Sequence, residues 1–276
     1  MTESVLSSPL RLNDGRAMPW IGLGTYDMPD GRSEALTRLA LELGYPAVDT
    51  ASFYGNEAEV GRGVRAHGGA APFVTTKLWR DALGFDAALR AFDRSEHALG
   101  LGAFDLYLIH WPEPERGLYV ETWRALIRLR DEGRVGSIGV SNFTEAHLAR
   151  IIDATGVVPA VNQVECHPRF QQQALRAHCR ALGVAFTAWS PLGRAQALAE
   201  PAIAAVARKH GRSAAQVVLR WHLQDGSIII PKASSRERLA ENLAVFDFAL
   251  DEADMAAIAA LDSPDGRLGP DPDTPF

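Results

Sequence analysis

The chain has 276 residues, and its 34 acidic and 28 basic side chains give it a formal net charge of −6. That charge disfavours binding to nucleic acid or to an anionic membrane, because both need a basic face. We see no apolar run of the roughly 18 residues that cross a bilayer, and residues 1–10 lack the pattern of a secretory signal. The two cysteines, Cys166 and Cys179, are too few to stabilise a chain of this length through disulfide bonds. We therefore expect free thiols and a cytoplasmic location.

Eight short apolar segments run along the chain, and each is followed by a helical pattern. Several are apolar almost throughout, which is typical of strands covered on both faces. Glycines suited to a left-handed helix cap follow the helical patterns. They are Gly44, Gly68, Gly100, Gly133, Gly156, Gly183 and Gly226. We expect strands at residues 21–25, 46–51, 73–78, 105–111, 135–141, 160–166, 184–190 and 227–232.

Residues 12–16 carry a turn signal that predicts a hairpin at the bottom of the fold, ahead of the first strand. Two helices are expected before the last strand, at 201–210 and 213–223, and Ser213 with Gln216 forms a capping box for the second. Two more helices, around 239–246 and 251–261, follow the last strand, and the tail from residue 266 reads as a loop.

Strand–helix alternation repeated eight times predicts a single (β/α)8 TIM barrel domain over residues 1–276. A doubly wound open sheet is the alternative. It is disfavoured because the turn after the first strand, Gly22-Leu-Gly24-Thr-Tyr, is not followed by the third glycine of a dinucleotide fingerprint.

Polar side chains gather at the carboxyl ends of the predicted strands, where the active sites of such barrels lie. Asp49, Lys77 and His110 come from strands two, three and four, and Tyr54 follows Asp49 closely. A buried ammonium lowers the pKa of a neighbouring phenol, and an aspartate offsets the cost of burying that ammonium. A histidine nearby orients a carbonyl oxygen. The four residues predict a proton-donating site suited to carbonyl reduction, with Tyr54 as the acid.

Other readings of these residues remain open. A lysine at a barrel strand end also suits a Schiff base or a phosphate ligand, so a sugar-phosphate isomerase or aldolase is one rival function. A metal site is disfavoured, because Asp49, His110 and His167 lack metal-ligand spacing.

From Gly22 to Phe248, the order and spacing of these motifs resemble the aldo-keto reductases. The resemblance implies a barrel that binds NADPH/NADP+ without a Rossmann fold, and it implies that Asp49, Tyr54, Lys77 and His110 are the catalytic tetrad. It is carried by residues 49–57 (Asp-Thr-Ala-Ser-Phe-Tyr-Gly-Asn-Glu), 76–78 (Thr-Lys-Leu), 108–112 (Leu-Ile-His-Trp-Pro), 139–143 (Gly-Val-Ser-Asn-Phe), 190–193 (Ser-Pro-Leu-Gly) and 230–232 (Ile-Pro-Lys).

The resemblance also implies a set of cofactor-binding residues. Trp189 replaces the tyrosine that usually stacks on the nicotinamide. Ala233 stands where many relatives have a serine on the 2′-phosphate, so we expect a clear but not extreme preference for NADPH over NADH. The implied nicotinamide carboxamide ligands are Ser141, Asn142 and Gln163; the 2′-phosphate ligands are Lys232 and Arg238; the adenine ligands are Glu241 and Asn242; and further contacts are Gly24, Thr25, Asp49, Ser190, Leu192 and Ser234.

The substrate is expected to be a small aldehyde or ketone in a pocket walled by aromatic residues, and the protein to be a monomer. The compact length, Trp189 and the short tail resemble the bacterial branch that includes 2,5-diketo-D-gluconic acid reductases. A catalytically silent NADPH-binding sensor on the same barrel is the second rival function. The residues expected to form the substrate pocket are Trp20, Tyr54, Trp79, His110 and Trp111.

Overall fold

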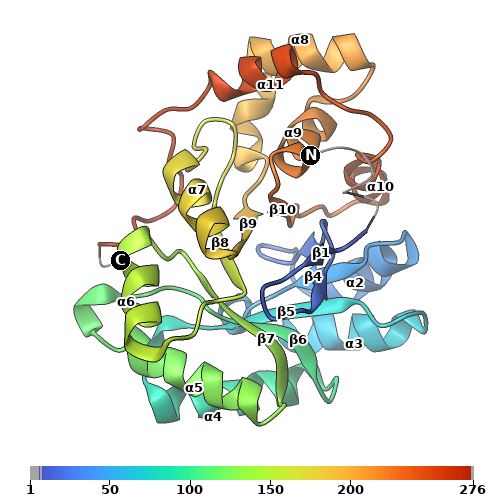
Figure 1. Ribbon diagram of the computed structural model, residues 1–276. Helices are drawn as coiled ribbons and strands as arrows, with labels where there is room; N and C mark the ends of the chain where they lie inside the picture. The colour runs from blue at the N-terminus through green and yellow to red at the C-terminus, as the bar shows by residue number, and fades with distance from the viewer. Residues whose placement is uncertain (1–5, 7, 275–276) are drawn as a thin grey trace.

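The structure, a computed structural model, describes residue 6 and residues 8–274. Eight parallel strands, hydrogen-bonded in chain order from β3 to β10, curl into a barrel with helices packed around it (Figure 1). Gly22 N donates to Ile229 O at 2.9 Å, and Ile21 pairs in parallel with Ile229, so the first strand meets the last. The predicted (β/α)8 barrel is confirmed, and the open doubly wound sheet is excluded.

The strands match the predicted segments. Those nearest the seam, the junction at which β3 meets β10, are shorter than expected. Where the first strand meets the last, pairing consists of one isolated bridge, Ile21–Ile229, and backbone hydrogen bonds such as Gly24 N to Pro231 O, in place of a long ladder. The barrel strands are β3 (Leu23–Gly24), β4 (Ala47–Asp49), β5 (Phe73–Leu78), β6 (Phe104–Ile109), β7 (Val135–Ser141), β8 (Val161–Glu165), β9 (Ala185–Trp189) and β10 (Ile228–Ile229).

The predicted hairpin is present: β1 (Leu10–Arg11) pairs antiparallel with β2 (Ala17–Met18). None of the described helices is long and apolar enough to span a membrane. The α-helices are α2 (Ser33–Glu42), α3 (Glu57–His67), α4 (Phe85–Leu99), α5 (Tyr119–Asp131), α6 (Glu145–Thr155), α7 (Gln173–Leu182), α8 (Pro201–His210), α9 (Ala214–Gln224), α10 (Arg236–Leu243) and α11 (Glu252–Ala259). Short 3₁₀ segments are η1 (Ser52–Tyr54), η2 (Arg80–Ala82), η3 (Pro114–Arg116) and η4 (Gly193–Ala199).

Local capping sets several helix ends. Ser213 and Gln216 form the predicted capping box at the start of α9. The helix after the last strand begins at Arg236, earlier than the expected 239, because the Ser235 side chain accepts the N–H of Arg238 and caps it there. All seven glycines expected to follow helices adopt positive φ, from 59° at Gly100 to 103° at Gly44.

The seam of the barrel depends on a close approach at Gly24. A Cβ atom there would lie 2.5 Å from the Ile230 carbonyl oxygen, which is backbone and cannot rotate away. At Gly22, the nearest atom to an added Cβ is the Ala47 Cβ at 3.2 Å, a contact that small shifts relieve.

We therefore expect Gly24→Ala to lower the free energy of unfolding by about 1–3 kcal/mol, the usual cost of overpacking. Gly22→Ala is the matched control, and it should cost clearly less. Urea unfolding followed by circular dichroism measures both. Equal stability of the Gly24→Ala variant and the parent chain would contradict this account of the seam.

Candidate active site

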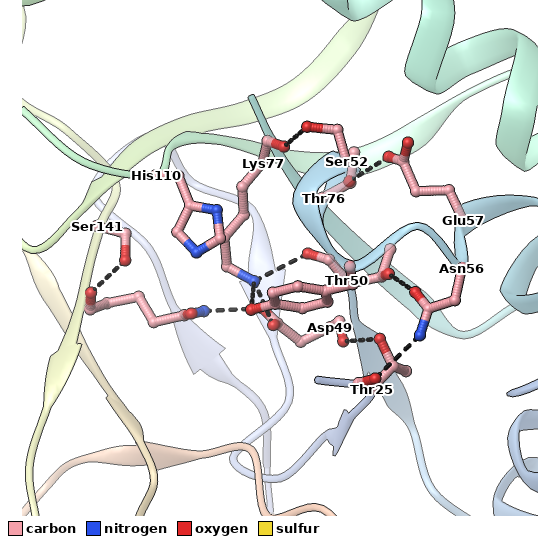
Figure 2. Close-up of polar contacts among 12 residues, drawn as sticks. Thr25, Asp49, Thr50, Ser52, Asn56, Glu57, Thr76, Lys77, His110 and Ser141 are labelled. Atoms are coloured by element: carbon pink, nitrogen blue, oxygen red, sulfur yellow. Dashed lines mark hydrogen bonds and ion pairs between the residues drawn. The ribbon is translucent and has the colours of Figure 1, made fainter. Parts of the chain in front are cut away.

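The fold brings the four predicted catalytic side chains to one end of the barrel. Asp49 is the last residue of β4, Lys77 lies near the end of β5, and His110 follows β6. Tyr54 ends the 3₁₀ turn η1, which follows β4 directly. Because neighbouring strands run parallel, their carboxyl ends share one face, and Figure 2 shows Asp49, Lys77 and His110 converging there.

Lys77 is the centre of this group. Its ammonium is fully buried and forms an ion pair with the Asp49 carboxylate. It also donates to the Thr50 carbonyl oxygen at 2.8 Å and lies 3.4 Å from the Tyr54 hydroxyl oxygen. Burial lowers the pKa of Lys77, and the charge and hydrogen bond of Asp49 oppose that shift.

The structure corrects one prediction about Tyr54. Lys77 was expected to lower the pKa of the phenol, but the pKa of Tyr54 is raised well above 10, first by burial and then by the charges of Asp49 and Tyr26. Burial penalises the charged phenolate and the negative charge of Asp49 adds to that penalty, so the pKa rises although the Lys77 ammonium lies close by. Tyr54 therefore keeps its proton at neutral pH, as a proton donor must.

His110 is held in its neutral form. Burial, followed by the positive charge of Lys77, moves the pKa of His110 well below 6.5. The indole of Trp79 meets the imidazole edge-on, with ring centroids 4.9 Å apart, and the Tyr54 ring lies 5.7 Å away. A neutral imidazole carries one N–H, which can donate a hydrogen bond to a carbonyl oxygen.

A chain of hydrogen bonds links the tetrad to the residues expected near the nicotinamide. The Gln163 side-chain amide donates to Asp49 Oδ2 at 2.7 Å, and Ser141 Oγ donates to the Gln163 carbonyl oxygen at 2.6 Å. Asn142 Nδ2 donates to Ser141 Oγ at 3.1 Å, and its Oδ1 accepts the indole N–H of Trp189 at 2.8 Å. The structure thus gathers these residues beside the tetrad.

The remaining expected cofactor residues fall into three groups. Ser190 and Leu192, both half-buried, lie between β9 and η4. Lys232, Ser234, Arg238 and Glu241 lie between the end of β10 and the body of α10, all at least partly exposed. Gly24, Thr25 and Asn242 are buried in the fold. Thr25 donates through its hydroxyl to the Asp49 carbonyl oxygen at 3.0 Å, so it holds the strand end.

The aromatic pocket differs in part from expectation. Trp79 lies beside His110, and Trp111 is buried directly after β6. Trp20 is not brought to this site: it lies at the amino end of the first strand, and its indole N–H donates to the Ser8 carbonyl oxygen at 2.8 Å.

Two aromatic residues at the site were missed by the sequence reasoning. Phe53 stacks on Trp79 with ring centroids 3.8 Å apart, and the Tyr26 ring lies 5.0 Å from that of Tyr54. Both are about half exposed, at 49% and 56%. The signal in the sequence was their position: Phe53 directly precedes Tyr54, and Tyr26 lies in the loop just after β3.

Comparisons with known proteins agree with this geometry. Residues 20–263 match the sequence profile described as "Aldo/keto reductase family". An aldo-keto reductase of Mycobacterium sp. (strain JLS) is 49% identical, over 98% of both chains. Morphine 6-dehydrogenase of Pseudomonas putida is 46% identical, over 96% of this chain and 95% of its own. The solved structure of a Gox0644 mutant in complex with NADPH superposes with a TM-score of 0.94 at 50% identity, over 98% of both chains. The chain belongs to the aldo-keto reductase family.

Proposed function

We propose that this protein is an NADP(H)-dependent reductase of aldehydes and ketones in which Tyr54 is the general acid. The observation that carries the proposal is the position of the Tyr54 hydroxyl, 3.4 Å from the ammonium of the buried Lys77–Asp49 pair, with the His110 ring meeting the Tyr54 ring edge-on. The raised pKa of Tyr54 and the lowered pKa of His110 agree with this role. Membership of the family and the NADPH complex of Gox0644 support the choice of cofactor.

The polar and cationic side chains at this end of the barrel fit the two ends of an NADP(H) molecule. Ser141, Asn142 and Gln163 present hydroxyl and amide groups complementary to a carboxamide, and we assign the nicotinamide end to them and to the face of Trp189. Lys232 and Arg238 supply cations near the amino end of α10, where backbone N–H groups also favour an anion. We assign the 2′-phosphate to them.

When bound, the cofactor supplies a hydride to the carbonyl carbon. The neutral His110 ring donates a hydrogen bond to the carbonyl oxygen and orients it. Tyr54 gives its hydroxyl proton to that oxygen, so the carbonyl becomes an alcohol, and the phenolate takes a proton back from solvent. Lys77 stabilises the transient phenolate, and Asp49 keeps Lys77 charged and in place.

Keto-sugar acids such as 2,5-diketo-D-gluconate are the first substrates to test, because the chain resembles the branch that reduces them. A panel with a keto-sugar acid, an aromatic aldehyde and a small dicarbonyl, followed by NADPH absorbance, identifies the class. Binding of NADPH without turnover of any carbonyl would favour the silent sensor instead. That the chain is one monomeric, cytoplasmic domain stays a prediction.

Tyr54→Phe should lower kcat by a factor on the order of 10²–10⁴, the usual contribution of general acid catalysis. The dissociation constant for NADPH should stay close to that of the parent, because the ring remains and only the acid is lost. Steady-state kinetics and a binding titration measure the two effects. A variant with the parent kcat would remove Tyr54 from the role of acid.

Lys77→Met should abolish most activity and lower the free energy of unfolding by about 3–5 kcal/mol, since it leaves the Asp49 carboxylate buried and unpaired. Adding Asp49→Asn should recover part of that stability, because the orphaned charge is then gone. The same substitution at Lys209, whose side chain is 47% exposed, is the control and should cost far less. Urea unfolding tests all three, and a stable Lys77→Met chain would be inconsistent with the pairing.

Arg238→Ala should weaken NADPH binding by about tenfold or more, since a charge-assisted contact contributes about 1.5–3 kcal/mol. Binding of NADH, which lacks the 2′-phosphate, should hardly change, so the preference ratio should collapse. Arg208→Ala, at an exposed arginine of α8, is the control. Titration of both cofactors by tryptophan fluorescence measures the ratio; equal losses for the two would mean that Arg238 supports the fold instead.

A further inference from the structure

A buried carboxylate at the end of β8 holds the segment that follows α11. Glu165 is only 1% exposed. Its carboxylate oxygens accept the backbone N–H of Leu268 at 2.6 Å and that of Gly269 at 2.8 Å, both more than 100 residues later in the chain. The Nε2–H of His167 donates to the same carboxylate at 3.0 Å. The C-terminal segment 263–269 is thus anchored to the carboxyl end of the barrel.

The charge state of Glu165 suits this role. Burial alone would raise its pKa, but the hydrogen bonds from His167, Leu268 and Gly269 outweigh burial and hold the pKa below its ordinary value. An ionised carboxylate only accepts hydrogen bonds, so all three donors are matched.

The anchored segment packs against one edge of the Trp189 ring. A Cβ atom at Gly269 would lie 2.5 Å from Trp189 Cη2, the outermost atom of the six-membered ring, and 3.0 Å from Glu165 Oε2. At its other edge, the indole donates its N–H to Asn142 Oδ1 at 2.8 Å. The ring is therefore held from two sides, by Asn142 and by the Gly269 backbone.

From this geometry we propose that Glu165 is a positioning residue: by holding Leu268 and Gly269, it fixes the indole plane of Trp189 on which the nicotinamide stacks. The inference rests on the proposed function, which assigns the nicotinamide to Trp189. A ring that is already held loses less conformational freedom when a ligand stacks on it, and so binds it more tightly. The contact needs tryptophan, because a tyrosine at position 189 has no atom equivalent to Cη2.

The first test is Glu165→Gln, which keeps the shape but replaces one acceptor by an NH₂ group facing a backbone donor. We expect faster hydrogen exchange in residues 263–274 and a dissociation constant for NADPH raised by about tenfold, the factor that corresponds to 1.4 kcal/mol. The change in kcat at saturating cofactor should be smaller than the change in cofactor binding. Glu132→Gln, at the exposed residue that directly follows α5, is the control and should change none of these quantities.

The second test is a double-mutant cycle that still applies if Glu165→Gln fails to fold. Gly269→Ala should raise the NADPH dissociation constant by about tenfold in the parent chain. In the Trp189→Tyr background the Cη2 contact is absent and only the looser approach to Glu165 Oε2 remains, so the same substitution should raise the constant by a clearly smaller factor. Coupling of this kind identifies the Gly269–Trp189 contact as the route of the effect.

Unchanged exchange and unchanged NADPH binding in Glu165→Gln would overturn the inference, and so would equal effects of Gly269→Ala in both backgrounds. Failure of the parent chain to bind NADPH at all would overturn the proposed function itself. Hydrogen exchange then still reports whether Glu165 holds the C-terminal segment, so the two failures are distinguishable.

Discussion

The active end of this barrel depends on one buried ion pair. The Lys77 ammonium has no exposed surface, and an isolated charge in such a place would be lost by deprotonation or would unfold the site. Asp49 on the next strand supplies the opposite charge, Thr50 supplies a carbonyl oxygen, and the Gln163 amide binds the second oxygen of Asp49. The pair itself comes from β4 and β5, and its two further partners come from β8 and from the residue that follows β4.

The pair governs the two groups that would face a substrate. At Tyr54, burial dominates and the negative charge of Asp49 acts in the same direction, so the phenol stays protonated. At His110, burial and the nearby ammonium act in the same direction, and the imidazole stays neutral. Both groups are hydrogen-bond donors at neutral pH, which is the arrangement that a polarised carbonyl oxygen requires. The electrostatics of the site thus favour reduction of a carbonyl over chemistry that needs a charged acid.

A second buried carboxylate, Glu165, organises the other side of the barrel mouth. Its partners are two backbone N–H groups of the C-terminal segment and the His167 ring, and Gly269 in that segment touches Trp189. Trp189 in turn reaches Asn142, Ser141, Gln163 and finally Asp49 through hydrogen bonds. The C-terminal segment is therefore linked to the Lys77–Asp49 pair by one apolar contact, between Gly269 and the Trp189 ring, followed by a chain of hydrogen bonds.

The barrel, the hairpin, the capping of α9 and the identity of the four clustered residues could all be predicted from the sequence, because strand period, turn chemistry and capping are local properties. The sequence also placed Asp49, Lys77 and His110 at one end, since parallel strands share their carboxyl face. The position of Trp20 away from the site also follows from the sequence, because Trp20 directly precedes the predicted strand 21–25. The direction of the Tyr54 pKa and the contact of Glu165 with Leu268 and Gly269 became known from the folded chain alone. The pKa depends on burial and the Glu165 contact on two segments far apart in the chain, and neither can be predicted from the spacing of neighbouring residues.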